Sequence, residues 1–184
     1  GIQNNHCEGD SMNIAPGNAQ HMGNREEQQD AFAFSDISNK KFIEHGGVLA
    51  VVADGMGGLA KGRAASSLAV RTLLKEYEAK TKRELVIEAL ARSAARANQA
   101  VYEMAMKAGM EGNAGTTLAA AVVHQGNLCW LSAGDSRIYL FRDGELSRIT
   151  VDHNYALELE RDVANGKISR DEAENNPERN HLIS

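Results

Sequence analysis

The chain has 184 residues, enough for one domain with a substantial buried core. Hydrophobic residues make up 42% of the chain and charged residues 24%, a composition typical of globular proteins. The formal net charge of -5 excludes the broad positive field that non-specific nucleic-acid binding requires, so we expect no nucleic-acid partner.

The two cysteines, Cys7 and Cys129, lie far apart and form no metal-ligand pattern. Such sparse cysteine usage is typical of a reducing compartment, and two free thiols are favoured over a single disulfide, which stays open. No apolar run is long enough to cross a bilayer, and the N-terminus has no apolar signal core. We therefore expect a soluble cytoplasmic protein with no membrane partner.

The first predicted elements are strands. Residues 1–18 show no period and indicate an irregular segment with at most one short strand. Residues 31–34 are typical of a strand, and residues 35–41 are polar. The continuous apolar run 48–53 predicts a strand covered on both faces. It ends at the turn-forming cluster 54–58.

Two helices are predicted next, over residues 61–80 and about 83–108, because apolar residues recur there at helical spacing. The apolar face of the second helix is rich in alanine, which allows close packing against a sheet. A partner-binding or membrane-surface helix is the alternative interpretation, and burial is favoured over it.

Four further strands are predicted before residue 151, separated by turn residues: 116–124, 128–133, 137–141 and 146–150. The pair Asp143-Gly144 is a strong hairpin signal because both residues tolerate positive φ. The short connections predict an antiparallel meander, and the unalternating run 118–123 again predicts a sheet covered on both faces. The fold class expected is a layered α/β sandwich.

Residues 152–184 are polar, with one amphipathic stretch, and predict a surface excursion. Ser169 and Glu172 have the spacing of a capping box that opens a short helix.

The first candidate for chemistry is Asp54, at the end of a buried strand and followed by Gly55. Carboxylate and backbone carbonyl oxygens are the ligands that Mg²⁺ and Mn²⁺ prefer. A purely structural alternative is that Asp54 caps the helix that follows. A phosphate-binding loop for a nucleotide is a further alternative, but residues 54–58 lack the Lys-Ser/Thr of a P-loop.

Asp30 begins a predicted strand, Asp135 lies in a third turn, and Arg25 lies five residues before Asp30. Each can also be an ordinary turn residue or surface charge. Together with Asp54 they match the needs of phosphoryl chemistry, in which two metals activate a bridging water and a guanidinium grips the phosphate.

The arrangement of these residues resembles the type-2C metal-dependent protein phosphatases, the PPM family, in their bacterial form. Five elements carry the resemblance, in the family's order: residues 24–32, 51–58, 115–118, 132–137, and the pair 152–153 with 176–180. Each element is weak alone, and the ordered set is specific.

The resemblance implies a four-layer αββα sandwich of mainly antiparallel sheets flanked by helices. It implies that Asp54 bridges two Mn²⁺ or Mg²⁺ ions, that the Gly55 carbonyl completes one, and that Asp30 serves the second. Arg25 would hold the substrate phosphate, and Asp135 would contribute to a third, weaker metal site. Arg25 and Asp54 are thus the expected catalytic residues.

The sequence departs from the family at Gln29, where some relatives have glutamate, and at Met56, where eukaryotic relatives have a histidine general acid. The family also continues with two more metal-binding aspartates after its flap segment. We therefore expect residues 1–184 to be the N-terminal portion of a single phosphatase domain, with 152–184 as the flap. A further C-terminal segment or another chain would complete the sheet.

The predicted function is hydrolysis of phosphoserine or phosphothreonine on signalling phosphoproteins through a metal-activated bridging water. The alternative is a non-catalytic pseudophosphatase module that binds phosphoproteins.

Overall fold

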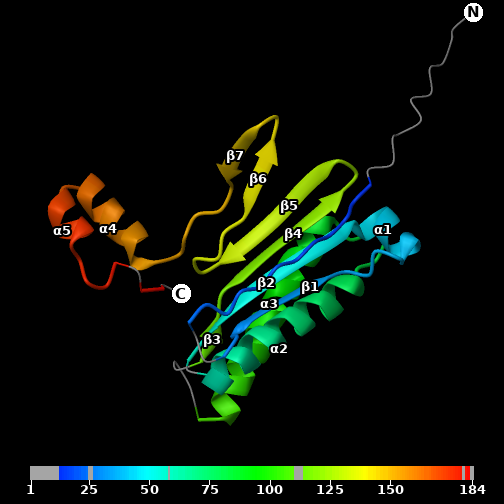
Figure 1. The fold of residues 1–184 in the computed structure, drawn as a ribbon, viewed down its shortest axis with the longest axis horizontal. Helices are drawn as coiled ribbons and strands as arrows, with labels where there is room; N and C mark the ends of the chain where they lie inside the picture. Colours follow the sequence, from blue (N-terminus) through cyan, green and yellow to red (C-terminus); the bar gives the residue numbers. More distant parts are fainter. Residues whose placement is uncertain (1–12, 25–26, 58, 110–113, 180, 183–184) are drawn as a thin grey trace, which may run out of the picture.

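The computed structural model describes residues 13–24, 27–57, 59–109, 114–179 and 181–182. Figure 1 shows the arrangement of its helices and strands. The elements, in chain order, are β1 (Asp30–Phe34), α1 (Lys40–Gly46), β2 (Val48–Met56), α2 (Leu59–Glu78), α3 (Val86–Lys107), β3 (Gly115–Thr116), β4 (Leu118–His124), β5 (Asn127–Ala133), β6 (Tyr139–Arg142), β7 (Glu145–Arg148), α4 (Tyr155–Ala164) and α5 (Arg170–Glu174). The predicted mixed α/β class, with antiparallel strands flanked by helices, is confirmed.

The main sheet has five strands in the order β1-β2-β4-β5, with the short β3 paired to the end of β2. Every pairing is antiparallel. The β4–β5 turn places Gln125 and Gly126 at positive φ, a geometry that matches the twist of the two strands. The sheet therefore combines segments far apart in the sequence, with β2 at its centre.

One face of this sheet is covered by α2 and α3 (Figure 1). The core between them contains residues from both layers, including Leu49, Val51, Leu73 and Leu90, all 1% exposed or less. Tyr77 is fully buried, and its hydroxyl donates a hydrogen bond of 2.6 Å to the Gly46 carbonyl. Burial of this apolar surface is the main stabilising contribution to the fold.

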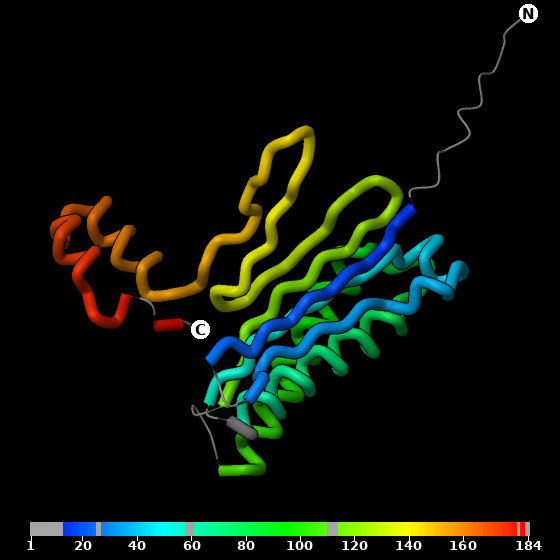
Figure 2. Tube along the Cα trace, viewed as in Figure 1, coloured from blue at the N-terminus to red at the C-terminus, as the bar shows by residue number. Residues whose placement is uncertain are grey.

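The opposite face of the sheet is open. Val52 of the central strand β2 is 46% exposed, and Trp130 of the edge strand β5 is 42% exposed. The prediction that 48–53 is covered on both faces is therefore wrong for the described part of the chain, whereas every residue of 118–123 is buried or half-buried. Residues 17–21 run along this face (Figure 2). They line a hollow over β1 and β2 together with Ser136.

Two local features differ from the sequence prediction. Helix α1 was not predicted, because seven residues are too few to show a period; its cap is Asn39, whose side chain accepts a hydrogen bond from the Phe42 N–H. The predicted four-strand meander is instead two hairpins, because the chain leaves the main sheet at Gly134, where φ is +92°. The β6–β7 hairpin itself is confirmed, with Asp143 and Gly144 at positive φ.

Helices α4 and α5 pack against each other and away from the main sheet (Figure 1). Leu159 and Ala173 are the buried residues of the two helices. The predicted capping box is confirmed: Ser169 Oγ accepts from the Glu172 N–H, and the Glu172 carboxylate accepts from the Ser169 N–H. In the described ranges no helix is long and apolar enough to cross a membrane. Cys129 is a free thiol, and Cys7 lies outside the described residues.

Candidate metal centre

Two aspartates face each other across neighbouring strands. Asp30 begins β1 and lies directly opposite Asp54 of β2. The Gly55 N–H donates to the Gln29 carbonyl at 3.2 Å, so the 29/55 pair is hydrogen-bonded and the adjoining Asp30/Asp54 pair is not. In such a pair the Cα atoms are only about 4.5 Å apart and both side chains leave the same face of the sheet. The register therefore brings the two carboxylates together.

Close packing of α2 supports this end of the sheet. A Cβ on Gly55 would lie 1.9 Å from the Gly62 carbonyl oxygen, and a Cβ on Gly62 would lie 2.7 Å from the Gly55 oxygen. The buried Ser66 hydroxyl donates to the Gln29 carbonyl at 2.5 Å. Only two glycines allow the backbones to approach so closely, and the approach holds the strand ends against the first turns of α2.

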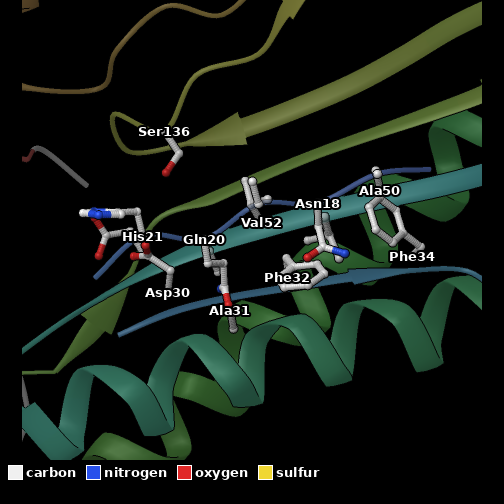
Figure 3. Close-up of a pocket in the computed structure, with 15 residues that line it drawn as sticks. Asn18, Gln20, His21, Asp30, Ala31, Phe32, Phe34, Ala50, Val52 and Ser136 are labelled. Carbon is white, nitrogen blue, oxygen red and sulfur yellow. The ribbon is translucent and has the colours of Figure 1, made fainter. Parts of the chain in front are cut away.

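The carboxylate pair lies in a hollow of about 560 Å³ on the open face of the sheet. Its floor comes from β1 and β2, one side from residues 17–21, and Ser136 lies across from them. Figure 3 shows a polar end, with Asp30, His21 and Ser136, and an apolar end, with Phe32 and Phe34. The hollow therefore combines charged groups with an apolar wall.

Like charges directly opposite one another destabilise an antiparallel pair unless something offsets their repulsion. A hard divalent cation is suited to this, since it prefers carboxylate and carbonyl oxygens and keeps several waters. Among the described residues no three His, Cys, Asp or Glu side chains lie close enough to hold a metal. The donor set therefore fits a cation held by two carboxylates, with the remaining ligands being carbonyl or water oxygens.

The predicted site residues are brought together only in part. Asp30 and Asp54 share the hollow, and Gly55 follows Asp54 as a buried residue. The Gly55 carbonyl oxygen lies beside Gly62 of α2, 2.7 Å from the position of a Cβ there, and Gly55 does not line the hollow. Asp135 is exposed in its turn and does not line the hollow, and Arg25 lies outside the described residues.

Two residues of the hollow were missed by the sequence analysis. His21 lies in an irregular segment, where no periodicity gives a signal, and its Nδ1 accepts a hydrogen bond of 3.0 Å from the Gly23 N–H. Ser136 follows Asp135 in the same motif, and the turn directs the serine into the hollow instead of the aspartate. The motif could have indicated Ser136, but its orientation depends on the turn.

The arginine of the same motif does not line the hollow. The Arg137 guanidinium donates to both oxygens of Asp152, at 3.0 Å and 2.6 Å. This bond, with a further contribution from Arg148, holds the pKa of the Asp152 carboxyl below its usual range. The interaction connects the base of the β6–β7 hairpin to the segment that leads into α4.

Comparisons with known proteins agree with this geometry. The sequence profile described as protein phosphatase 2C matches residues 18–180. The chain is 36% identical over 138 residues to the serine/threonine phosphatase stp of Listeria monocytogenes, covering 73% of this chain and 54% of that protein. Several solved structures also match.

The structure of the S. agalactiae serine/threonine phosphatase superposes with a TM-score of 0.68 at 31% identity, covering 87% of this chain and 62% of that one. The catalytic domain of the phosphatase PstP, solved in complex with two manganese ions, superposes with a TM-score of 0.59 at 31% identity, covering 81% of this chain and 58% of that one. The chain thus spans little more than half the length of these proteins. With the profile matching residues 18–180, the chain belongs to the protein phosphatase 2C family.

Proposed function

We propose that the protein hydrolyses phosphoserine and phosphothreonine on proteins and that it uses Mn²⁺ or Mg²⁺ to do so. The observation that carries the proposal is the direct opposition of Asp30 and Asp54 in one hollow. Relatives named as serine/threonine phosphatases, and one structure solved with two manganese ions, support the reaction and the metal. The chain would form the N-terminal portion of a single phosphatase domain, with residues 152–184 as its flap.

Asp30 and Asp54 would hold the cations, with the Gly55 carbonyl as a further ligand and Asp135 at a third, weaker site. When bound, divalent cations lower the pKa of water and offset the charge that develops on the phosphoryl oxygens. Arg25 would bind two phosphate oxygens through its planar guanidinium. The apolar wall formed by Phe32 and Phe34 would limit the water that reaches the phosphate, which strengthens these charge interactions.

The partners of this site would be phosphorylated proteins in signalling, in the cytoplasm. The mildly acidic chain argues against nucleic acid as a partner, and the sparse cysteine usage supports a reducing compartment.

The decisive experiment is hydrolysis of a phosphothreonine peptide by the protein with Mn²⁺ present and after its removal with a chelator. Asp54→Asn keeps the size of the side chain and removes its charge, so we expect kcat/KM to fall about a hundredfold or more. Asp162→Asn is the matched control, because Asp162 of helix α4 pairs with Lys167, which follows that helix, and does not line the hollow. Unchanged hydrolysis by Asp54→Asn, or full activity in chelator, would refute the proposal.

A non-catalytic phosphoprotein-binding module remains the second candidate. It is favoured by the exposed position of Asp135 and by the lack of a three-residue ligand group in the described residues. Such a module would bind the phosphopeptide in the presence of Mn²⁺ and release it unchanged. Phosphate release measured on the same sample separates the two functions.

A further inference from the structure

The strand that pairs with the end of β2 is interrupted beside Asp54. β3 pairs Thr116 with Gly55, and β4 resumes in the same register with Ala119 opposite Val52. At the interruption the Thr117 N–H donates to the Asp54 carbonyl at 2.9 Å, as in a regular ladder. The Asp54 N–H, however, donates to the Thr117 hydroxyl at 2.9 Å. A side-chain hydroxyl thus takes the place of a backbone carbonyl behind the carboxylate pair.

The same threonine contacts the turn that contains Asp135. Thr117 is 2% exposed, and its Oγ1 lies 2.6 Å from Ser136 Oγ. A Cβ on Gly134 would lie 2.8 Å from the Thr117 methyl carbon, and Gly134 has a φ of +92°. The methyl and hydroxyl groups of Thr117 therefore both contact the turn, and this turn places Ser136 in the hollow.

The number of hydrogens in this network decides what Ser136 can do. A threonine hydroxyl has one hydrogen and two acceptor positions, and Thr117 Oγ1 already accepts from the Asp54 N–H. When Thr117 donates its own hydrogen to Ser136, the Ser136 hydroxyl keeps a hydrogen for an oxygen in the hollow. Thr116 adds to the order, since its hydroxyl lies within hydrogen-bond distance of both the Asp54 carbonyl, at 2.9 Å, and the Thr117 carbonyl, at 3.0 Å.

We propose that Thr117 is a positioning residue that holds the Asp54 backbone and directs the Ser136 hydroxyl toward an anionic oxygen of the phosphorylated substrate. Its role in the reaction rests on the proposed function. Its role in ordering Asp54 and Ser136 does not, because it is defined by hydrogen bonds among this chain's own residues. Thr117 acts through these two residues and does not itself line the hollow.

The first test replaces Thr117 by valine, which has the same shape without the hydroxyl, and by serine, which keeps the hydroxyl. Mn²⁺ binding is measured by calorimetry, with thermal unfolding as a check on the fold. Thr117→Val removes the hydroxyl that accepts from the part-buried Asp54 N–H, so we expect Mn²⁺ affinity to fall about tenfold. Thr117→Ser is expected to bind Mn²⁺ within about twofold of the parent. Equal affinity of the valine variant and the parent would overturn the proposal.

The second test uses Ser136→Ala, which leaves the bond between Asp54 and Thr117 in place and therefore remains informative if the valine variant does not fold. Mn²⁺ affinity is expected to change by less than about twofold, because Asp54 stays anchored. Binding of inorganic phosphate to the Mn²⁺-loaded protein is expected to weaken about fivefold or more, because a hydrogen-bond donor to a charged oxygen is lost. Unchanged phosphate affinity would overturn the role of Ser136.

The two proposals can fail separately. If the parent protein binds Mn²⁺ and phosphate but releases no phosphate from the peptide, the proposed function is wrong. The affinities of the Thr117 and Ser136 variants still decide whether the positioning role holds.

Discussion

The two faces of the main sheet differ in composition and in cover, although they belong to the same strands. On the helix-covered face, Leu49, Val51 and Ala53 of β2 are 2% exposed or less. On the open face, Val52 is 46% exposed and Asp54 lies in the hollow. Adjacent residues of one strand therefore have different roles, because side chains alternate between the faces.

This difference separates stability from chemistry. The covered face is tightly packed, and its backbone at Gly55 and Gly62 approaches within contact distance. The open face holds a pair of like charges that a core could not accommodate without a compensating cation. The close packing on one side fixes the register that brings the two carboxylates together on the other. Four predictions test this comparison.

The largest effect is expected from Gly55→Ala. The new Cβ would lie 1.9 Å from the Gly62 carbonyl oxygen, and neither backbone can move away cheaply. We expect the free energy of unfolding to fall by about 3 kcal/mol or more. Gly17→Ala is the control, because no atom lies within 4 Å of its Cβ position. Chemical denaturation measures both variants, and similar values for the two would show that the close approach is not required.

A pair of identical substitutions on opposite faces comes next. Val51→Ala should lower the free energy of unfolding by about 2 kcal/mol, because Val51 is 1% exposed in the core. Val52→Ala should change it by less than about 0.5 kcal/mol, because its side chain is half exposed. Equal losses at the two positions would mean that the second face is covered as well as the first.

A third prediction concerns the buried hydroxyl under the covered face. Tyr77→Phe should cost about 1 kcal/mol of stability at neutral pH, because the Gly46 carbonyl loses its donor.

Burial also raises the pKa of the Tyr77 phenol above its ordinary value, so the folded state keeps its proton at a pH where the unfolded chain loses it. The contribution of Tyr77 to the parent's stability should therefore be constant below about pH 10 and fall above it, so the alkaline loss of stability should be smaller in Tyr77→Phe. Denaturation curves at several alkaline pH values measure this, and parallel losses in both proteins would contradict it.

The smallest effect is expected outside the main sheet, at Asp152. The Arg137 guanidinium holds the pKa of the Asp152 carboxyl below its value in the unfolded chain. The ion pair therefore stabilises the folded state above about pH 4, and this contribution is lost as the pH falls through the lower pKa of the folded state. Asp152→Asn should loosen only the base of the hairpin, where the Ile149 N–H donates to the Ile138 carbonyl. Amide exchange of Ile149 should become faster, while exchange in β2 stays unchanged. Faster exchange in β2 would show that the hairpin supports the main sheet.

Much of the fold was predictable from local patterns. Apolar runs and helical spacing located β2, α2 and α3, and the pairs Asp143-Gly144 and Ser169/Glu172 predicted a hairpin turn and a helix cap that the structure contains. Helix α1 was missed because its seven residues make only about two turns, too few for apolar residues to recur at helical spacing. The open sheet face was missed because a continuous apolar run can occur in a strand with one covered face as well as in a strand with two.

The sequence by itself determined the family, the order of the elements and the candidate residues Asp30 and Asp54, because these depend on residue types and spacings along the chain. Tertiary structure decided that Asp30 lies opposite Asp54, that Ser136 and not Asp135 enters the hollow, and that Thr117 replaces a carbonyl in the ladder. The physical reason is that strand register and turn direction depend on contacts between residues distant in the chain. A shift of one residue in the strand register would turn these side chains to the other face of the sheet.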